Sequence, residues 1–347
     1  MEERIKILEN LPGALLPWYQ KARRDLPWRK DRDPYHVWVS EIMLQQTRVE
    51  AVKGYYDRFL KAIPHVQALA SAEDDLLRKL WEGLGYYSRV RNLKKAANVI
   101  VDAYDGVFPG DYDQIRSLPG IGDYTAGAIA SICFDKSTPA VDGNVLRVVS
   151  RLLADDTPID SPAVKKQVSK ELAAVYPPQT GEFTQALMEL GATVCGPNKD
   201  PDCGNCPCRS FCKGHLEGVA EKLPVRLPKK IRRQEDMTVL ILSCDGKIAL
   251  EKRPEEGLLG GLWQFPNVSG KLDAPGALQY LQEQGMMPKD LIRIVERKHI
   301  FTHIQWNMTG IYMEMRTLDP RCFWFSLEQI KGKIPLPTAF RKFIEGI

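Results

Sequence analysis

The chain has 347 residues, of which 44% are hydrophobic and 27% charged, and its formal net charge at pH 7 is +4. This length exceeds what one hydrophobic core usually spans, so about two domains are expected. No apolar run approaches the roughly 18 residues that cross a bilayer, and MEERIKILEN lacks the apolar part of a secretory signal, which indicates a cytoplasmic globular protein.

The chain changes its pattern once. Residues from about 5 to 190 carry helical periodicity, as in LLRKLWEGLG and NLKKAANVIVDAY, with almost no strand-like alternation. EKLPVRLPKKIRRQED then indicates an exposed linker, either solvated or in passing contact with phosphates. Beyond Met237, runs such as TVLILS, KIALEK and TGIYMEMRT predict strands, with one helix at ALQYLQEQG, so the second domain is expected to be α+β.

The first chemical motif is an acid inside an apolar helix, VWVSEIMLQQTRVE, where Glu41 has apolar neighbours on both sides. A carboxylate is costly to bury unless it is paired or has a chemical role. The alternative for Glu41 is a position that faces solvent.

The second motif is LPGIGDYTAGAIA, in which a helix ends near Ser117, Gly120 and Gly122 permit a tight turn, and a helix begins at about Thr125. This pattern predicts a helix-hairpin-helix over about residues 111–130. Glycines let a phosphate approach the N–H groups of a helix N-terminus. Taken alone, they suit a purely structural turn equally well.

Two further motifs follow in the same half. AVDGNVLRVVSR places Asp142 after an apolar lead-in with Asn144 two residues later, although Asp-Gly by itself is a common turn. Five of the eight cysteines then lie between Cys195 and Cys212. In a reducing cytosol such a cluster indicates metal rather than disulfides, and four thiolates suit zinc or a 4Fe-4S cluster.

Together these motifs resemble the adenine DNA glycosylases, relatives of endonuclease III. The matching segments are LPWR from Leu26, SEIMLQQTRV from Ser40, GLGYYSRVRNL from Gly83, LPGIGDYTAGAI, VDGNV and the cysteine run. The match is collinear and covers nearly the whole chain. It implies an all-α helix-hairpin-helix glycosylase domain over residues 1–216 with an iron-sulfur loop at 195–212, a linker at 217–236, and a Nudix-like 8-oxoguanine recognition domain at 237–347.

The resemblance implies hydrolytic removal of adenine that lies opposite 8-oxoguanine or guanine in double-stranded DNA. Breaking the N-glycosidic bond calls for one acid and one carboxylate, as in glycoside hydrolysis. Glu41 takes the first role and Asp142 the second, with Tyr124 and Asn144 beside them. Bifunctional relatives carry a lysine at the position of Tyr124, so this chain is expected to be monofunctional and to leave an abasic site.

The resemblance also assigns contacts to DNA. Gln46 and Tyr86 enter the base stack when the target base is flipped out, and Thr47 and Leu84 lie beside the opposite base. Core packing or a solvated surface is the alternative for every assigned residue. The others that shape the adenine pocket or hold DNA are Arg24, Trp28, Arg29, Leu44, Gly120, Gly122 and Gln185.

In the second domain, Phe301, Thr302 and His303 resemble the family's loop that inspects 8-oxoguanine, with threonine where serine is commoner. The alternative is a turn between strands with Phe301 in the core. A Nudix hydrolase would need a glutamate-rich helix for metal and pyrophosphate, whereas ALQYLQEQG contains only Glu283 as an acid. A recognition role is therefore better supported than hydrolase chemistry.

The implied cluster ligands are Cys195, Cys203, Cys206 and Cys212, separated by seven, two and five residues. The first gap is one residue longer than the family's, and Cys208 is an additional thiol that could compete as a ligand. The resemblance favours one 4Fe-4S cluster, with a structural cation at the hairpin. It further implies a monomer that acts at nucleoid DNA and not at a membrane.

Rival functions remain at this point. The nearest is a pyrimidine-lesion or thymine-mismatch glycosylase on the same scaffold, against which Glu41 and the whole second domain argue. A DNA-binding protein without catalysis would require Glu41 and Asp142 to be idle together. A Nudix hydrolase comes third.

Overall fold

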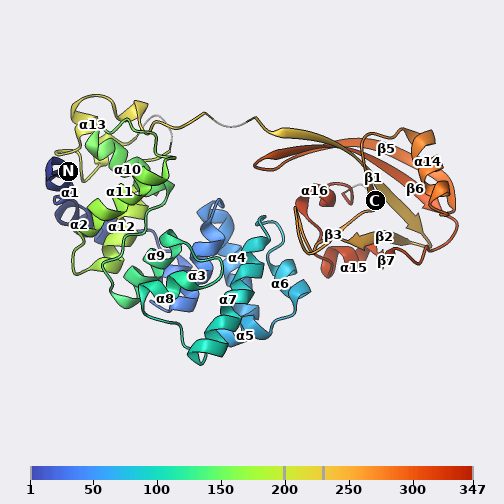
Figure 1. Ribbon diagram of the computed structural model, residues 1–347, viewed down its shortest axis with the longest axis horizontal. Helices are drawn as coiled ribbons and strands as arrows, with labels where there is room; N and C mark the ends of the chain where they lie inside the picture. The colour runs from blue at the N-terminus through green and yellow to red at the C-terminus, as the bar shows by residue number, and fades with distance from the viewer. Residues whose placement is uncertain (1, 198–200, 229–230, 346–347) are drawn as a thin grey trace. The chain divides into compact units, whose positions relative to one another are not determined.

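The structure is a computed structural model that describes residues 2–197, 201–228 and 231–345 (Figure 1). The chain divides into two compact units. The helical unit comprises Met1–Ser71 and Asn92–Pro228, and the sheet unit comprises Ala72–Arg91 and Lys229–Ile347. The segment Ala72–Arg91, which lies within the helical half of the sequence, thus groups with the C-terminal half. No helix in the described ranges is long and apolar enough to span a membrane.

The helical unit is all-α, as the sequence predicts. Short 3-10 turns occupy Pro27–Arg29, Cys203–Asn205 and Ala220–Lys222. Its helices are α1 (Glu2–Leu8), α2 (Leu11–Ala22), α3 (Pro34–Leu44), α4 (Val49–Ala62), α5 (Val66–Ser71), α7 (Ser88–Tyr104, which begins in the sheet unit), α8 (Tyr112–Ser117), α9 (Asp123–Phe134), α10 (Gly143–Leu153), α11 (Pro162–Ala173), α12 (Thr180–Thr193) and α13 (Lys213–Leu216).

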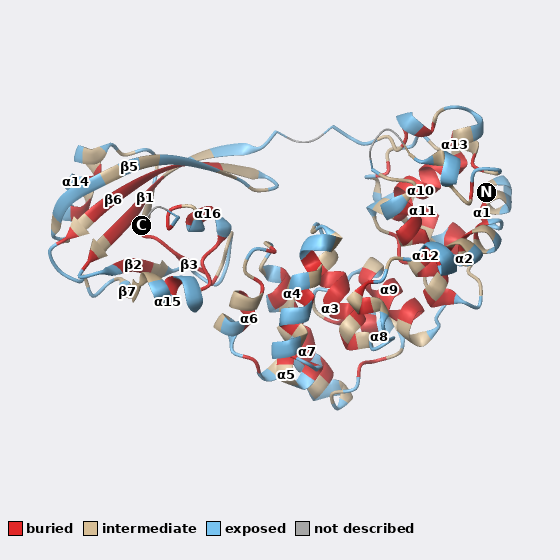
Figure 2. Ribbon diagram, turned by 180° about the vertical axis from the view of Figure 1, so that it is seen from behind, coloured by how far each residue is buried: buried red, intermediate tan, exposed pale blue. Residues whose placement is uncertain are grey.

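Small residues allow the central helices to approach one another closely. All side chains of α9 from Thr125 to Ile132 are buried, and Figure 2 shows α3, α9 and α10 largely in the colour of buried residues. A Cβ added at Gly127 of α9 would stand 2.3 Å from the carbonyl oxygen of Pro139, and one at Gly191 of α12 would stand 2.9 Å from Cβ of Asn144. Close approach therefore depends on glycine at these positions.

The predicted helix-hairpin-helix is formed by α8 and α9. Gly120 has φ +78°, and a Cβ there would lie 2.6 Å from Cβ of Asn92. Gly122 differs, because its φ is −99° and no atom would lie within 4 Å of an added Cβ. The turn therefore requires glycine only at Gly120, and Gly122 leaves the N-terminus of α9 uncovered. The helix begins at Asp123, earlier than expected, with its carboxylate favourably placed in the first turn.

The sheet unit is α+β, as expected. Its seven-stranded sheet has the order β3-β2-β1-β6-β5, with β4 paired to β1 and β7 to β2. β1 and β6 run parallel, and the other pairs are antiparallel. The elements are α6 (Asp74–Leu80), β1 (Arg233–Cys244), β2 (Lys247–Lys252), β3 (Trp263–Gln264), β4 (Asn267–Ser269), α14 (Ala274–Glu283), β5 (Pro288–Ile300), β6 (Ile304–Met315), β7 (Phe323–Ser326), α15 (Leu327–Gly332) and α16 (Thr338–Arg341).

The sheet has a hydrophobic core on each face, because side chains alternate along a strand. On β1, Val239 and Ile241 pack with Phe340 of α16. Leu240 and Leu242 lie on the opposite face with Leu281 of α14. The predicted helix ALQYLQEQG is α14, and the predicted loop Phe301–His303 joins β5 to β6.

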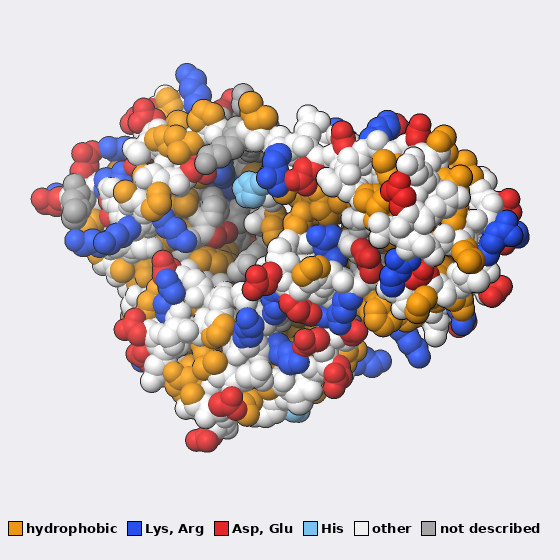
Figure 3. Space-filling view, turned by 45° about the vertical axis from the view of Figure 1, so that its right-hand side comes forward, with side chains coloured by type: hydrophobic (Ala, Val, Ile, Leu, Met, Phe, Trp, Pro, Cys, Tyr) orange, Lys and Arg blue, Asp and Glu red, His pale blue; other side chains and the backbone are white. Residues whose placement is uncertain are grey.

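Charge is mixed over the surface. On the face drawn in Figure 3, Lys and Arg side chains are interspersed with Asp and Glu side chains. The small positive net charge therefore forms no broad single-sign area on that face.

Two glycines provide a matched test of the packing. Gly127→Ala should lower the melting temperature, because its Cβ would overlap the Pro139 carbonyl and overpacking costs about 1–3 kcal/mol. Gly13→Ala, inside α2 with nothing within 4 Å of the new Cβ, should raise it, since alanine favours a helix over glycine by about 0.5–1 kcal/mol. Thermal unfolding followed by circular dichroism measures the melting temperature of each variant. Equal changes from the wild-type melting temperature in the two variants would contradict the packing argument.

Candidate active site

A cavity of about 720 Å³ in the helical unit brings together residues that are far apart in the sequence. It lies among α3, α9, α10, α11 and α12 and the turn before α3. All four residues expected to act in catalysis line it. The predicted residues in its wall are Arg24, Trp28, Arg29, Glu41, Leu44, Gln46, Thr47, Tyr124, Asp142, Asn144 and Gln185.

Glu41 is a buried carboxyl group on α3, only 5% exposed. The hydroxyl of Tyr124 on α9 donates a hydrogen bond to its Oε2 at 2.5 Å. Burial raises the pKa of Glu41 to about 7, the nearby Asp142 adds to the rise, and the Tyr124 hydrogen bond opposes it. Glu41 therefore does not face solvent, and it holds a proton up to near-neutral pH, as a general acid must.

Asp142 is the N-cap of α10, which explains its local conformation. Its carboxylate accepts the backbone N–H groups of Asn144 at 2.9 Å and Val145 at 2.8 Å, and the side-chain amide of Asn144 at 2.7 Å. Burial raises the pKa of Asp142, whereas these three donors favour its ionised form. The group is a fixed acceptor whose position is set by the helix.

Tyr124 is positioned as a donor. Its hydroxyl lies between Glu41 and Sδ of Met188, which is 4.0 Å away. Burial and the neighbouring carboxylates raise the pKa of Tyr124 well above its ordinary value, so the hydroxyl remains protonated. A lysine does line the same cavity, Lys165 of α11, which the sequence analysis did not single out.

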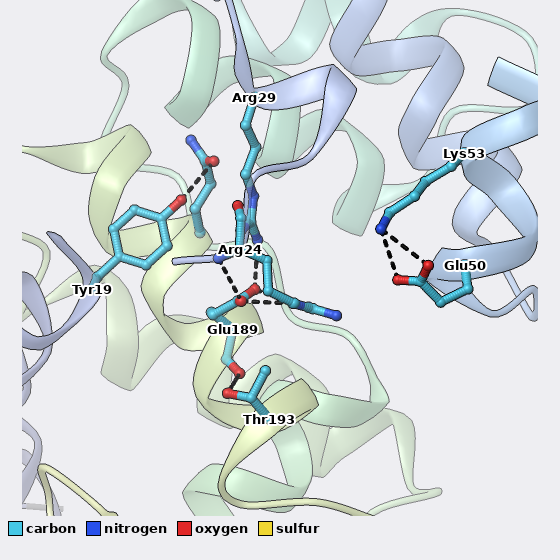
Figure 4. A network of polar contacts seen from close by, with 8 residues as sticks. Tyr19, Arg24, Arg29, Glu50, Lys53, Glu189 and Thr193 are labelled. Carbon is cyan, nitrogen blue, oxygen red and sulfur yellow. Dashed lines mark hydrogen bonds and ion pairs between the residues drawn. The ribbon is translucent and has the colours of Figure 1, made fainter. Parts of the chain in front are cut away.

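Arg24 and Arg29 converge on one buried acid (Figure 4). Arg24 Nε lies 2.7 Å and Arg29 Nη2 2.8 Å from carboxylate oxygens of Glu189 on α12, whose side chain is fully buried. Burial alone would raise the pKa of Glu189, but the Arg24 hydrogen bond and the charge of Arg29 hold it below its ordinary value. The sequence analysis missed Glu189, although an acid in the apolar run ALMELGA is the same signal that identified Glu41.

Gln185, one turn before Glu189, also has a fixed partner in the helical unit. The hydroxyl of Tyr19 on α2 donates to its Oε1 at 2.9 Å. Burial raises the pKa of Tyr19, so this donor keeps its proton. Gln185 is thereby held at the wall of the cavity by a residue that the sequence analysis did not identify.

Asp142 is connected to the cysteine loop through hydrogen bonds. Arg147 Nη2 donates to the side-chain oxygen of Asn144 at 3.0 Å, and Arg147 Nε donates to the carbonyl of Cys195 at 3.0 Å. Arg151 Nη1 lies 3.4 Å from Sγ of Cys195. Both arginines are buried, so the loop and the carboxylate share one rigid support.

The expected cluster ligands are neighbours. The charges of Cys195, Cys203 and Cys206 each raise the pKa of Cys212, after the larger effect of burial. Within the described ranges, no three His, Cys, Asp or Glu side chains stand in a metal-binding arrangement. A site with four thiols and the guanidinium of Arg151 nonetheless fits a group that binds thiolates and carries net negative charge.

The extra thiol, Cys208, is fully buried in the helical core, and it donates a hydrogen bond to Cys206 that lowers the pKa of that neighbour. Cys208 is thus a core side chain next to one of the expected cluster ligands. It remains an alternative ligand, as the sequence analysis states.

The sheet unit holds a second group of predicted residues. A cavity of about 670 Å³ is lined by Leu84, Tyr86 and the loop Phe301–His303. The hydroxyls of Tyr86 and Thr302 are hydrogen-bonded to each other. The ring of Phe301 lies 4.8 Å from that of Trp306 and packs on the core, as its alternative interpretation states, whereas Thr302 and His303 are exposed. Gly120 and Gly122 line neither cavity.

The buried carboxyl predicts a dependence of stability on pH. The pKa of Glu41 is about 7 in the folded state against 4.5 ordinarily, so the folded state binds more protons between these values and this group's contribution to stability falls as pH rises through them. Glu41→Gln keeps an acceptor for Tyr124 without a charge. The melting temperature of the variant relative to the wild-type protein should therefore rise between about pH 5 and 8, and a constant difference would contradict a raised pKa.

Comparison with known proteins gives the same assignment along the chain. Residues 39–178 match the family "HhH-GPD superfamily base excision DNA repair protein", and residues 237–346 match the NUDIX domain. A thermostable thymine-DNA glycosylase matches in structure with a TM-score of 0.55 and 27% identity, over 62% of this chain and 98% of that one.

Curated relatives extend the match to both units. The human adenine DNA glycosylase is 37% identical, covering 95% of this chain and 72% of its own length. That of Buchnera aphidicola (subsp. Baizongia pistaciae) is 34% identical, covering 96% of this chain and 95% of its own. The chain therefore belongs to the adenine DNA glycosylases of the HhH-GPD superfamily, enzymes that remove adenine from DNA by hydrolysis of its N-glycosidic bond.

Proposed function

We propose that this glycosylase acts on adenine paired with 8-oxoguanine, and with guanine, and that it leaves an abasic site. The observation that supports this choice is the hydrogen bond between Tyr86 and Thr302, which joins a residue of the GLGYY segment to the loop between β5 and β6. Leu84 and His303 line the same cavity. Tyr86, which is suited to enter the base stack, and the loop Phe301–His303, which is suited to contact the opposite base, thus line the same cavity.

The chemistry of 8-oxoguanine suits that wall. The oxidised base differs from guanine at N7 and C8, so a protein must present hydrogen-bonding groups to that edge. Thr302 supplies an exposed hydroxyl, and the backbone carbonyl of His303 is already bonded to the N–H of Arg233. An unmade hydrogen bond to a buried group costs about 1–3 kcal/mol, which is enough to discriminate.

The excision step uses the two acids differently. Glu41, protonated near neutral pH, donates its proton to the departing adenine, while Tyr124 orients the carboxyl group. Asp142, fixed by three N–H donors, stabilises the positive charge that develops on the sugar. The water that completes hydrolysis is activated by Glu41 once its proton has been transferred.

We further propose that Cys195, Cys203, Cys206 and Cys212 hold a 4Fe-4S cluster that cross-links the loop.

The loop contains basic side chains that could contact DNA phosphates. Of these, Lys213 is paired with Glu3 at 2.5 Å, and Lys199 lies outside the described residues. Arg209 is exposed, with Nε 3.2 Å from Nε2 of His215. The enzyme is proposed to act as a monomer at nucleoid DNA.

The identity of the opposite base is tested with three duplexes, carrying A opposite 8-oxoguanine, A opposite guanine, and T opposite guanine. Single-turnover excision followed by alkali should reveal cleavage of both adenine duplexes, faster with 8-oxoguanine, and none of the third. Thr302→Ala combined with His303→Ala should reduce the rate ratio between the two adenine duplexes by about tenfold, equivalent to one lost hydrogen bond. Glu41→Gln serves as the inactive control, and an unchanged ratio would remove the loop from recognition.

Monofunctional action is tested by borohydride trapping. The wild-type enzyme should form little covalent complex, because Tyr124 offers no amine to the sugar. Tyr124→Lys should gain trapping. Since Lys165 lines the same cavity, Lys165→Ala in both backgrounds is the matched control. Trapping by the wild-type enzyme that is lost in Lys165→Ala would show that this lysine acts as a nucleophile and would contradict the proposal.

The cluster is tested by metal analysis of protein made under iron-replete, anaerobic conditions. Four irons and four sulfides per chain are expected. Cys206→Ser should lose most of the iron, whereas Cys208→Ala should retain it. Stoichiometric zinc in the wild-type protein, or iron loss in Cys208→Ala equal to that in Cys206→Ser, would overturn the ligand assignment.

A further inference from the structure

A second cavity of about 650 Å³ adjoins the catalytic one inside the helical unit. The two share Arg24, Arg29, Ile132 and Gln185 in their walls. Each volume is within the range of about 300–1,000 Å³ that is usual for small-molecule sites. The two acids and the tyrosine of the catalytic centre, Glu41, Asp142 and Tyr124, do not line the second cavity, so it is no part of the chemistry already described.

The outer wall of the second cavity faces solvent. Arg23, Asp25, Lys30 and Gln179, all in its wall, are exposed. Arg32 in the same wall is paired with Asp135 at 2.5 Å, so charges of opposite sign are close together. A wall of balanced charge favours neither a phosphate nor a cation, and it suits a neutral polar ligand.

The residues shared by both walls form a partition between the cavities, which has a rigid part and a movable part. Arg24 and Arg29 are tied to fully buried Glu189, and separating them from that carboxylate would leave a buried charge unpaired, which is strongly unfavourable. Gln185 is tied by the single hydrogen bond from Tyr19 at 2.9 Å, whose net contribution is of the order of 1 kcal/mol. Gln185 is therefore the part of the partition that can move aside at low cost.

Gln185 is also chemically suited to a purine. The carboxamide of glutamine pairs with N6 and N7 of adenine through two hydrogen bonds. Tyr19 lines only the second cavity, and its ring centre lies 5.6 Å from the guanidinium of Arg29, so both provide flat faces against which a purine can stack. The same glutamine can thus serve a base on either side of the partition.

We propose that the second cavity is the route and transient binding site by which free adenine leaves the enzyme while the abasic duplex is still bound. This inference rests on the proposed function. The extruded nucleotide enters the catalytic cavity attached to DNA, so after hydrolysis its sugar still occupies the entrance. Adenine, a neutral base with no remaining bond to the strand, then passes Gln185 into the second cavity and reaches solvent between the exposed residues of its outer wall.

The experiment compares three rates on one substrate, a biotinylated duplex whose target adenine carries a radioactive label, with the enzyme in excess. Alkali treatment gives the rate of base excision. Rapid filtration of bead-bound complexes gives the rate at which labelled adenine enters the filtrate. Competitor abasic duplex gives the rate at which the enzyme leaves the product DNA. The wild-type enzyme is expected to release adenine about tenfold or more faster than it leaves the DNA.

Gln179→Trp tests the route itself. Gln179 is exposed in the outer wall and belongs to neither the catalytic nor the DNA-binding residues, and a tryptophan there would narrow the exit. Adenine release should slow by about tenfold, with excision and DNA dissociation unchanged. Gln179→Ala, which removes the same side chain without filling the space, is the matched control and should release adenine at the wild-type rate.

The outcomes separate the two proposals. If the wild-type enzyme excises adenine but releases it only as fast as it leaves the DNA, the exit route is wrong and the proposed function stands. If Gln179→Trp excises and releases adenine at wild-type rates, the route does not pass this wall. If the wild-type enzyme excises no adenine from the duplex, the proposed function itself fails. Should Gln179→Trp not fold, the wild-type comparison alone decides.

Discussion

The hydrogen bond from Tyr124 to Glu41 is the interaction on which the architecture of the helical unit depends. A carboxyl group that is 5% exposed must have a partner, and the partner here is on another helix. The contact requires α3 and α9 to lie side by side, so both helices are buried over most of their length. On the same helix the chain at Pro139 lies so close that a Cβ at Gly127 would stand 2.3 Å from the Pro139 carbonyl oxygen. α9 therefore carries both the polar contact to α3 and a position that only glycine fits.

Much of the site followed from residue types in the sequence, because an acid in an apolar helix is a local signal. Glu41 is identified in this way and Asp142 through the resemblance, and the structure brings both into one cavity with Tyr124 and Asn144. The residues that hold Gln185, Arg24 and Arg29 in place are not identified from the sequence, since they are distant along the chain. Tyr19, 166 residues from Gln185, is an example: a buried tyrosine in an amphipathic helix is indistinguishable from an ordinary core residue until the fold is known.

The fold was predicted at the level of architecture and less well in its details. Hydrophobic alternation identified the strands of the sheet unit, whereas nothing in LLRKLWEGLG indicated that Ala72–Arg91 groups with that sheet. The grouping comes from specific pairs, such as Arg78 with Glu255 at 2.9 Å, that charge patterns do not specify in advance. Likewise, the sequence does not distinguish Gly120 from Gly122, because only the backbone conformation shows that glycine is required at Gly120 and not at Gly122.

The helical scaffold by itself does not determine which base is removed. A thymine-DNA glycosylase matches the structure over 62% of this chain, and residues 237–346 have a separate match to the NUDIX domain. The curated adenine DNA glycosylases, in contrast, match along almost the whole chain. The helical framework alone therefore does not identify the base that is removed.

Two buried glutamates in this site illustrate how the environment assigns opposite roles to one residue type. Glu189 is paired with two arginines, which hold its pKa below the ordinary value, so it is an ionised structural anchor. Glu41 has a tyrosine instead, and burial raises its pKa to about 7. The charge of Arg29 lowers the pKa of Glu41, although less than burial raises it. Arg29 is paired with Glu189 at 2.8 Å, so one arginine belongs to the ionised anchor while burial keeps the pKa of the neighbouring Glu41 raised.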